Sequence, residues 1–239
     1  MIRIFRPIPV ESLKLLVFDL DGTLIDSAQD LANSVNATLC HFGRTALTDA
    51  IIAGYIGDGA LMLMRRAIGG GNGNVVDEEF LASAYDYFLD YYREHKLDYT
   101  YAYEGVAEAL AALAESSQTR TMAVLTNKPV RPAQAICEAL GLAPHLFSIY
   151  GGNSFATKKP DPEGLLALMR EAGAQPEETV MIGDSEVDVR TARNAGAWSI
   201  GCTFGLAPQT LAENPPDILV DAPTEWLAAL TPAKLVSRQ

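Results

Sequence analysis

The sequence predicts an α/β protein with a parallel-sheet, Rossmann-like core and a small all-helical cap domain inserted after the first strand. Short, unbroken apolar runs recur along the 239 residues and alternate with helical patterns. Strands that are buried on both faces of a parallel sheet have this pattern, and the helices between them cover the two faces. The alternation is interrupted once, early in the chain, by a long stretch of helical patterns alone. This stretch predicts the inserted domain.

The first predicted strand is the apolar run Leu15–Phe18. Similar runs predict five further strands, at residues 121–125, 147–150, 179–182, 199–202 and 218–220. Between these runs, helices are predicted at residues 106–113, 132–140, 164–172 and 187–195. The last three helical patterns each end at a glycine, which is a common helix-terminating residue.

The cap is predicted over residues 28–102, which contain amphipathic helical patterns at 31–42, 61–68 and 78–92 and no convincing strand. The core is therefore expected to comprise residues 1–27 and 103–239. A glycine-rich patch at residues 69–74 follows a helical pattern. A phosphate-binding glycine loop follows a strand instead, so we interpret this patch as a flexible turn between cap helices.

Charge and composition exclude several classes of partner. A net charge of −12 disfavours nucleic acid and membrane surfaces, because an acidic surface repels phosphate groups. The first residues do not resemble a signal peptide, and no run approaches the roughly 20 apolar residues of a membrane-spanning helix. The three cysteines, Cys40, Cys137 and Cys202, are far apart and form no C-x-x-C motif. We therefore expect a cytoplasmic protein without a disulfide scaffold or a zinc site.

The strongest chemical signal is the pair of aspartates, Asp19 and Asp21, that follows the first strand. Two carboxylates two residues apart at a strand end point in the same general direction. Because it is costly to bury both without a partner, a cation is expected between them. Gly22 lets the chain turn sharply and exposes backbone N–H groups. Open α/β sheets bind their ligands at this edge.

Two further polar segments lie after later predicted strands. Thr126 and Asn127 follow the strand at 121–125, and their hydroxyl and amide groups can donate hydrogen bonds to phosphoryl oxygens. Lys159 precedes a proline, which favours extended geometry over a helix, so its side chain can point inward.

A third polar segment begins with Asp184, which follows the strand at 179–182 as Asp19 follows the first strand. Asp184 is therefore a candidate third metal ligand. Asp188 has two interpretations of equal weight. It is either a further metal ligand or a helix-capping residue, because Ser185 and Asp188 have the spacing of a capping box.

These motifs, in this order and spacing, resemble those of the haloacid dehalogenase-like hydrolase superfamily. The resemblance covers nearly the whole chain and is greatest to the phosphoglycolate phosphatase group, through residues 19–27, 57–60, 126–129 and 159–162. Two residues depart from the usual pattern of that group. Glu104 stands where a proline is usual, and Asn153 where an aspartate is usual. Both lie beside the expected site, so they bear on the substrate rather than on the reaction type.

The resemblance implies a Mg²⁺-dependent phosphatase of a small phosphorylated metabolite, active as a monomer or homodimer, that is transiently phosphorylated on Asp19. A carboxylate suits this nucleophilic role because, with a reference pKa of about 3.9, it is ionised at neutral pH. Asp21 is expected to exchange protons with the leaving alcohol and with water. Lys159 is expected to hold Asp19 and the phosphate together. The other implied roles are phosphoryl and substrate binding by Thr126, Gly22, Thr23 and Asn127, and Mg²⁺ binding by Asp19, Asp21 through its backbone carbonyl, Asp184 and Asp188.

The helical insert resembles the cap that closes over the site in this superfamily. Closure would exclude water and read the leaving group of the substrate. Arg65 and Arg66 are candidates for binding a substrate carboxylate, which arginine can hold bidentately. The alternative is that both are ordinary cations on a helix surface.

Several rival functions share part of this pattern. A sugar phosphomutase, a pyrophosphatase or a nucleotidase of the same superfamily would keep the same motifs. A phosphonate hydrolase would need a Schiff-base lysine from the cap, where Lys96 is the only lysine. Asp21 and the metal site argue against a dehalogenase. A regulatory module that kept the fold without catalysis is a further alternative. The absence of a G-x-S-x-G motif argues against a Ser/His/Asp hydrolase.

Overall fold

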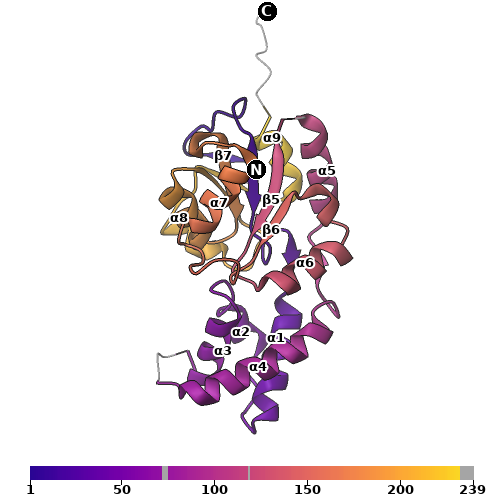
Figure 1. Ribbon diagram of the computed structural model, residues 1–239, viewed down its shortest axis with the longest axis vertical. Helices are drawn as coiled ribbons and strands as arrows, with labels where there is room; N and C mark the ends of the chain where they lie inside the picture. Colours follow the sequence, from indigo (N-terminus) through magenta and orange to yellow (C-terminus); the bar gives the residue numbers. More distant parts are fainter. Residues whose placement is uncertain (72–74, 118, 232–239) are drawn as a thin grey trace, which may run out of the picture.

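The computed structural model describes residues 1–71, 75–117 and 119–231. Figure 1 shows two bodies, a sheet with helices on both sides and, below it, a group formed by the first four helices. Part of the predicted glycine-rich turn, residues 72–74, lies outside the described residues. Within the described part of the chain, no helix combines the length and the apolar character needed to cross a membrane.

Within the described residues, the core is a seven-stranded sheet of order β1-β9-β8-β7-β2-β5-β6. All neighbouring strands are parallel except the edge strand β1, which pairs antiparallel with β9. The six predicted apolar runs form the parallel strands, which confirms the α/β class. The two-residue strand β1 was not predicted because it is too short to show a pattern. The strands are β1 (Arg3–Ile4), β2 (Leu15–Phe18), β5 (Thr121–Leu125), β6 (Ser148–Tyr150), β7 (Thr179–Gly183), β8 (Trp198–Cys202) and β9 (Ile218–Val220).

Helices cover both faces of this sheet, as Figure 1 shows. Successive side chains of a strand point to opposite faces, and β2 illustrates the result. Leu16 and Phe18 pack into one hydrophobic cluster with α5, α6 and α9, whereas Leu15 and Val17 pack into another with α7 and α8. The elements are α5 (Val106–Ser116), α6 (Val130–Ala139), α7 (Glu163–Ala172), α8 (Glu186–Ala195) and α9 (Trp226–Ala229), with short 3₁₀ turns η1 (Ala143–His145), η2 (Pro176–Glu178), η3 (Pro208–Ala212) and η4 (Pro223–Glu225).

The stretch between β3 and β4 forms four helices, α1 (Ala28–His41), α2 (Asp49–Ala53), α3 (Ala60–Gly69) and α4 (Glu78–His95). The sequence predicted three of them and missed the five-residue α2, which is too short to show a helical period. These helices share a hydrophobic cluster of their own, separate from the two clusters of the sheet. Val35, Ile52, Met64 and Phe88 are fully buried within it.

One expectation for this stretch was wrong. It was expected to contain no strand, but Tyr101–Ala102 forms a two-residue strand, β4, that pairs antiparallel with β3 (Ile25–Asp26). A strand this short has no readable alternation, and its partner lies far away in the sequence. Next to this pair, the buried carboxylate of Asp30 accepts hydrogen bonds from the backbone N–H groups of Tyr99 and Thr100. The entry and exit of the helical segment are therefore tied together.

Candidate active site

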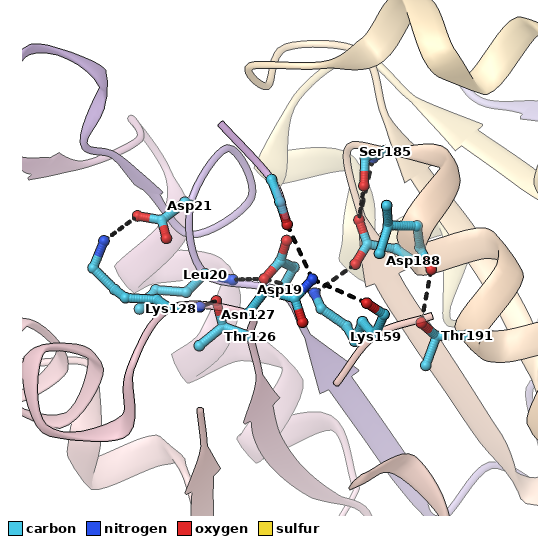
Figure 2. A network of polar contacts seen from close by, with 12 residues as sticks. Asp19, Leu20, Asp21, Thr126, Asn127, Lys128, Lys159, Ser185, Asp188 and Thr191 are labelled. Carbon is cyan, nitrogen blue, oxygen red and sulfur yellow. Dashed lines mark hydrogen bonds and ion pairs between the residues drawn. The ribbon is translucent and has the colours of Figure 1, made fainter. Parts of the chain in front are cut away.

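The predicted chemical residues meet at the carboxyl edge of the central strands. In the parallel sheet, Phe18 of β2 lies beside Val124 of β5 and Ile182 of β7. The residues that follow these three strands therefore emerge side by side. Asp19, Thr126 and Asp184 line one cavity together with Asp21 and with side chains of α1, α3 and α4. Figure 2 shows the polar network at this edge.

Lys159 joins two buried carboxylates at the centre of this network. Its ammonium lies 2.8 Å from Oδ1 of Asp19 and 2.7 Å from Oδ1 of Asp188 (Figure 2). Burial lowers the pKa of Lys159, but attraction to Asp188 and Asp19 outweighs burial, so its pKa lies above the ordinary value. The lysine therefore stays charged. Asp19 Oδ1 also accepts a hydrogen bond from the N–H of Leu20 at 2.7 Å, so this carboxylate is held in one orientation.

Three buried aspartates form an acidic cluster beside Lys159. Carboxylate oxygens of Asp19, Asp184 and Asp188 lie within 4.8 Å of one another. Burial raises the pKa of Asp19 to about 7, against the opposing attraction of Lys159. Burial, together with repulsion from Asp188 and Asp19, raises the pKa of Asp184 to about 8. A cation would relieve both shifts, and the all-oxygen donor set is the kind that Mg²⁺ prefers.

The turn after β2 brings the backbone against Asp184. Gly22 has a φ of +85°, and a Cβ atom at this position would lie 2.3 Å from Oδ2 of Asp184. A side chain there would need both a left-handed backbone and the displacement of this carboxylate. The same Oδ2 accepts hydrogen bonds from the backbone N–H groups of Leu206 and Ala207, at 2.6 and 2.9 Å. Asp184 is thus held from two sides.

Asp188 caps α8 and also holds Lys159. Its Oδ2 accepts hydrogen bonds from the N–H and the hydroxyl of Ser185, at 3.2 and 2.7 Å, and the capping box is complete. Its Oδ1 is the oxygen that contacts Lys159. Both oxygens are therefore engaged by protein donors, which supports the capping interpretation. Asp188 still belongs to the acidic cluster, so it remains a candidate metal ligand on the ground of its position alone.

Asp21 lies on the cavity wall with two donors on one oxygen. Oδ1 accepts hydrogen bonds from the hydroxyl of Ser27 at 2.5 Å and from the ammonium of Lys128 at 2.7 Å. Sequence reasoning assigned no role to Lys128. The string Thr126-Asn127-Lys128 placed it near the site, but no local pattern shows that this lysine turns toward Asp21. Its side chain is almost fully buried.

Thr126 and Asn127 both line the cavity, but their side chains differ in what they offer. The Thr126 hydroxyl accepts a hydrogen bond from the N–H of Lys128 at 3.2 Å, so its own proton is free for a ligand. The Asn127 amide donates to the carbonyls of Gly57 and Lys159 at 3.0 and 3.1 Å. Its donors therefore link the helical segment to the core, and the expected contact of this side chain with phosphoryl oxygens stays a prediction.

Gly22 and Thr23 also differ from expectation. The N–H of Gly22 bonds the carbonyl of Ile25 at 2.8 Å, and the N–H of Thr23 bonds the carbonyl of Leu20 at 3.2 Å. Both N–H groups therefore close the turn rather than face a ligand. The hydroxyl of Thr23 is fully buried without a hydrogen-bond partner among the described residues. These two residues shape the turn after Asp21.

The structure does not bring Arg65 to this cavity. The guanidinium makes two parallel bonds to the carboxylate of Glu78, at 2.7 and 2.8 Å, beside a separate surface hollow. Arg66 pairs with Asp58 and donates to the carbonyl of Tyr55. The bidentate partner of Arg65 thus belongs to the same helical segment, and the expectation that Arg65 reads the substrate stays a prediction.

Comparison with known proteins agrees with this geometry. A family model described as haloacid dehalogenase-like hydrolase matches residues 16–202, and the chain belongs to this family. It is accordingly an enzyme of the hydrolase class.

Two curated relatives are named phosphoglycolate phosphatase. One, from Agrobacterium fabrum, is 36% identical over 227 residues and covers 94% of each chain. The other, from Chromobacterium violaceum, is 38% identical over 198 residues, covering 83% of this chain and 88% of the relative. A crystal structure titled as a predicted phosphoglycolate phosphatase from Haemophilus somnus has a TM-score of 0.85 and 31% identity. It covers 92% of this chain and 99% of its own.

Proposed function

We propose that the chain is a Mg²⁺-dependent phosphatase of a small phosphomonoester such as 2-phosphoglycolate, and that it acts through a phosphorylated Asp19. The observation that carries the proposal is the arrangement around Asp19. Lys159 holds its carboxylate, the acidic cluster lies on one side, and Asp21 lines the same cavity. The names of the curated relatives support the same chemistry.

Asp19, Asp184 and the backbone carbonyl of Asp21 would hold the metal ion. The oxygen donors fit Mg²⁺, and the raised pKa of Asp184, caused by burial and then by Asp188 and Asp19, shows how poorly the cluster tolerates its own charge. When bound, the ion would neutralise the repulsion between the Asp19 carboxylate and the phosphate. The Asp188 oxygens are already taken by Ser185 and Lys159, so we assign Asp188 to positioning.

In the first chemical step, a carboxylate oxygen of Asp19 forms a bond to phosphorus while the bond from phosphorus to the ester oxygen breaks. Asp21 gives its proton to the departing alkoxide, and the product alcohol leaves. The Thr126 hydroxyl and the Lys159 ammonium donate to the phosphoryl oxygens during transfer. This step leaves a phosphoryl group on Asp19 and a carboxylate on Asp21.

In the second step, the Asp21 carboxylate takes a proton from a water molecule. The water oxygen bonds to phosphorus, the bond to Asp19 breaks, and inorganic phosphate leaves with Asp19 regenerated. Splitting hydrolysis in this way suits one of the slowest uncatalysed reactions, for which total enhancements reach about 10²¹.

We assign the four-helix segment to the role of a cap over this site. The Asn127 amide bonds the Gly57 carbonyl, and Lys158 bonds the Asp58 carbonyl, so backbone of the helical segment is attached at the rim of the cavity. Leu63 and Phe88 of this segment supply apolar walls of the cavity. A cap of this kind would exclude water from Asp19 until a substrate has bound.

Phosphate release from a panel of esters, with Mg²⁺ and with a chelator, tests the proposal. The panel would include 2-phosphoglycolate, hexose phosphates, nucleotides and pyrophosphate. Metal-dependent release that is greatest with a small phosphomonoester is expected. Isomerisation of a hexose phosphate without phosphate release would indicate a phosphomutase instead. Folded, Mg²⁺-binding protein that releases phosphate from none of these compounds would overturn the proposal.

A further inference from the structure

Lys128 is a buried cation that the proposed reaction does not use. Its ammonium lies 2.7 Å from Oδ1 of Asp21, and its side chain is 3% exposed. Among the described residues that line the cavity, it is the only cationic one. An ammonium carries three N–H donors, and Asp21 accepts one of them. Donors therefore remain for a ligand in the cavity.

Tyr92 of α4 lies beside this lysine and lines the same cavity. The Lys128 ammonium lies 4.9 Å from the centre of the Tyr92 ring. The Tyr92 side chain is 2% exposed. Its hydroxyl lies close enough to the Lys128 ammonium to help raise the pKa of the lysine, but among the described residues it forms no hydrogen bond of regular geometry. Leaving a buried hydroxyl unpaired is costly, because it has lost its hydrogen bonds to water. An unpaired donor at the wall of a cavity indicates a ligand group that completes it.

The rest of this wall offers little else that is polar. Of the three α4 side chains that line the cavity, Phe88 and Leu89 are apolar and only Tyr92 carries a polar group. Leu31 of α1 and Leu63 of α3 extend the apolar surface. Charge attraction is stronger in such surroundings than in water. An anionic group on the leaving half of a substrate would therefore be bound mainly by Lys128 and Tyr92.

The position of Lys128 also limits the length of the substrate. If Asp21 protonates the ester oxygen, that oxygen lies within hydrogen-bond distance of Asp21. Lys128 is in turn one hydrogen bond away from Asp21. A carboxylate separated from the ester oxygen by one carbon reaches both with little loss of chain freedom. A carboxylate at the end of a longer flexible chain reaches both only at a greater cost in conformational entropy.

We propose that Lys128 and Tyr92 are specificity-determining residues that bind a carboxylate on the leaving group and select short carboxylated phosphomonoesters. The inference rests on the proposed phosphatase function and adds the residues that choose the substrate. It assigns to the cap–core contact around Tyr92 the role that sequence reasoning had given to Arg65.

The test compares 2-phosphoglycolate with ethyl phosphate, which has the same chain length without the carboxylate. For each enzyme, the ratio of the two kcat/KM values isolates recognition of the carboxylate from any general effect on Asp21. Lys128→Met is expected to lower this ratio on the order of 100-fold, because a buried charge contact is lost. Tyr92→Phe should lower it about 10- to 100-fold, the size of one hydrogen bond to a charged group. Lys128→Arg, which keeps the charge, should retain part of the preference.

Lys96→Met is the matched control. Lys96 is the half-buried lysine that directly follows α4; it bonds the carbonyl of Arg93 and does not line the cavity. This variant should leave the ratio unchanged. The phosphate ester of 4-hydroxybutyrate tests the effect of length. The wild type should prefer it over butyl phosphate less than it prefers 2-phosphoglycolate over ethyl phosphate.

A second readout covers variants with too little activity to measure. In the Asp19→Asn background, titration calorimetry would compare binding of 2-phosphoglycolate and ethyl phosphate, with and without Lys128→Met. The inference predicts that only 2-phosphoglycolate loses affinity. If Lys128→Met and Tyr92→Phe reduce both esters equally in rate and in binding, the inference is wrong while the proposed phosphatase function stands. A wild-type enzyme that hydrolyses neither ester but releases phosphate from another compound of the panel would overturn this inference alone, and one that hydrolyses no compound of the panel would overturn both.

Discussion

At the scale of single residues, the site is a balance of unlike charges. The carboxylates of Asp19 and Asp188 contact the ammonium of Lys159, and that of Asp184 completes an acidic cluster with them. Three negative charges and one positive charge leave a formal charge of −2, which a divalent cation would neutralise. This explains why burial raises the pKa of Asp19 and Asp184 while Lys159 remains a cation. A bound divalent cation would thus offset, at this site, the net negative charge of the chain.

The raised pKa values predict how metal-free protein responds to pH. The pKa of Asp184 is about 8 and that of Asp19 about 7, each raised first by burial. An unfolded aspartate has a pKa of about 3.9. Between these values the folded state binds more protons, so this pair makes the free energy of unfolding fall as pH rises from about 4 to about 8. Asp184→Asn should therefore stabilise metal-free protein at pH 8, and much less at pH 5.

Thermal unfolding at the two pH values, with a chelator, measures this effect. A difference between wild type and Asp184→Asn that does not change with pH would contradict it. With saturating Mg²⁺ at pH 8, the wild type should gain roughly 5 °C or more in Tm, whereas Asp184→Asn should gain little. The same variant thus serves as the control for metal binding.

Substitutions of Asp19 and Asp21 are predicted to affect turnover in different ways. Asp19→Asn should show no detectable turnover, because an amide cannot form the phosphorylated intermediate. Asp21→Asn should lose about 10²–10⁴-fold in turnover, the usual contribution of proton transfer. It should still take a phosphoryl group from a donor such as p-nitrophenyl phosphate, whose leaving group needs little protonation.

Mass spectrometry after mixing distinguishes the two variants. Asp21→Asn is expected to carry one added phosphoryl group, on the peptide that contains Asp19, and the Asp19→Asn protein none. Retained turnover in purified Asp19→Asn protein would rule out the nucleophile assignment. An Asp21→Asn enzyme with wild-type turnover would contradict the proposed role of Asp21 in proton transfer.

At the scale of elements, the turn between β2 and β3 fits closely against the loop that follows β7. Gly22→Ala is predicted to disrupt this fit, because the added Cβ would lie 2.3 Å from Oδ2 of Asp184. The variant should lose the Mg²⁺-dependent rise in Tm and about 100-fold or more in activity, since misplacement of about 1 Å at a catalytic site can cost that much. Scanning calorimetry measures the Mg²⁺-dependent rise in Tm, and phosphate release measures the activity.

Gly43→Ala is the matched control for backbone strain. Gly43 also has a positive φ, +67°, but a Cβ there would meet nothing within 4 Å. Both variants carry a left-handed alanine, which costs about 1–2 kcal/mol. Gly43→Ala should therefore lose stability while keeping its response to Mg²⁺ and its activity. Equal loss of the metal response in both variants would show that strain, not contact with Asp184, is the cause.

At the scale of the whole molecule, the helical segment and the sheet have separate hydrophobic cores. Local stability should therefore differ between them. Leu81→Ala, at a residue 2% exposed within the helical core, should cost about 3 kcal/mol there. Hydrogen exchange should speed up at amides of α1 to α4 and change little in β2, β5 and β7. Leu61→Ala, at a residue 41% exposed on α3, is the control and should change neither group. Equal acceleration in the sheet would contradict independent cores.

The predictable part of the fold is the part with long local patterns. The apolar runs of β2 and of the five other parallel strands predicted these strands, since strands buried on both faces must be apolar throughout. The strands β1, β3 and β4 each have two residues, and α2 has five. These elements form because a partner or a neighbouring helix lies beside them, so no local pattern marks them.

The α/β class, the positions of the main strands along the chain and the acidic and basic residues at their ends can all be predicted from the amino-acid sequence. These features depend on neighbours in the chain, such as the buried run before Asp19. Which charges meet depends on the folded molecule. Lys128 pairs with Asp21, Asp188 with Lys159 and Arg65 with Glu78. Ion pairs form between side chains that are close in space, and these pairs span 107, 29 and 13 positions of the chain. Their geometry therefore exists only in the folded molecule.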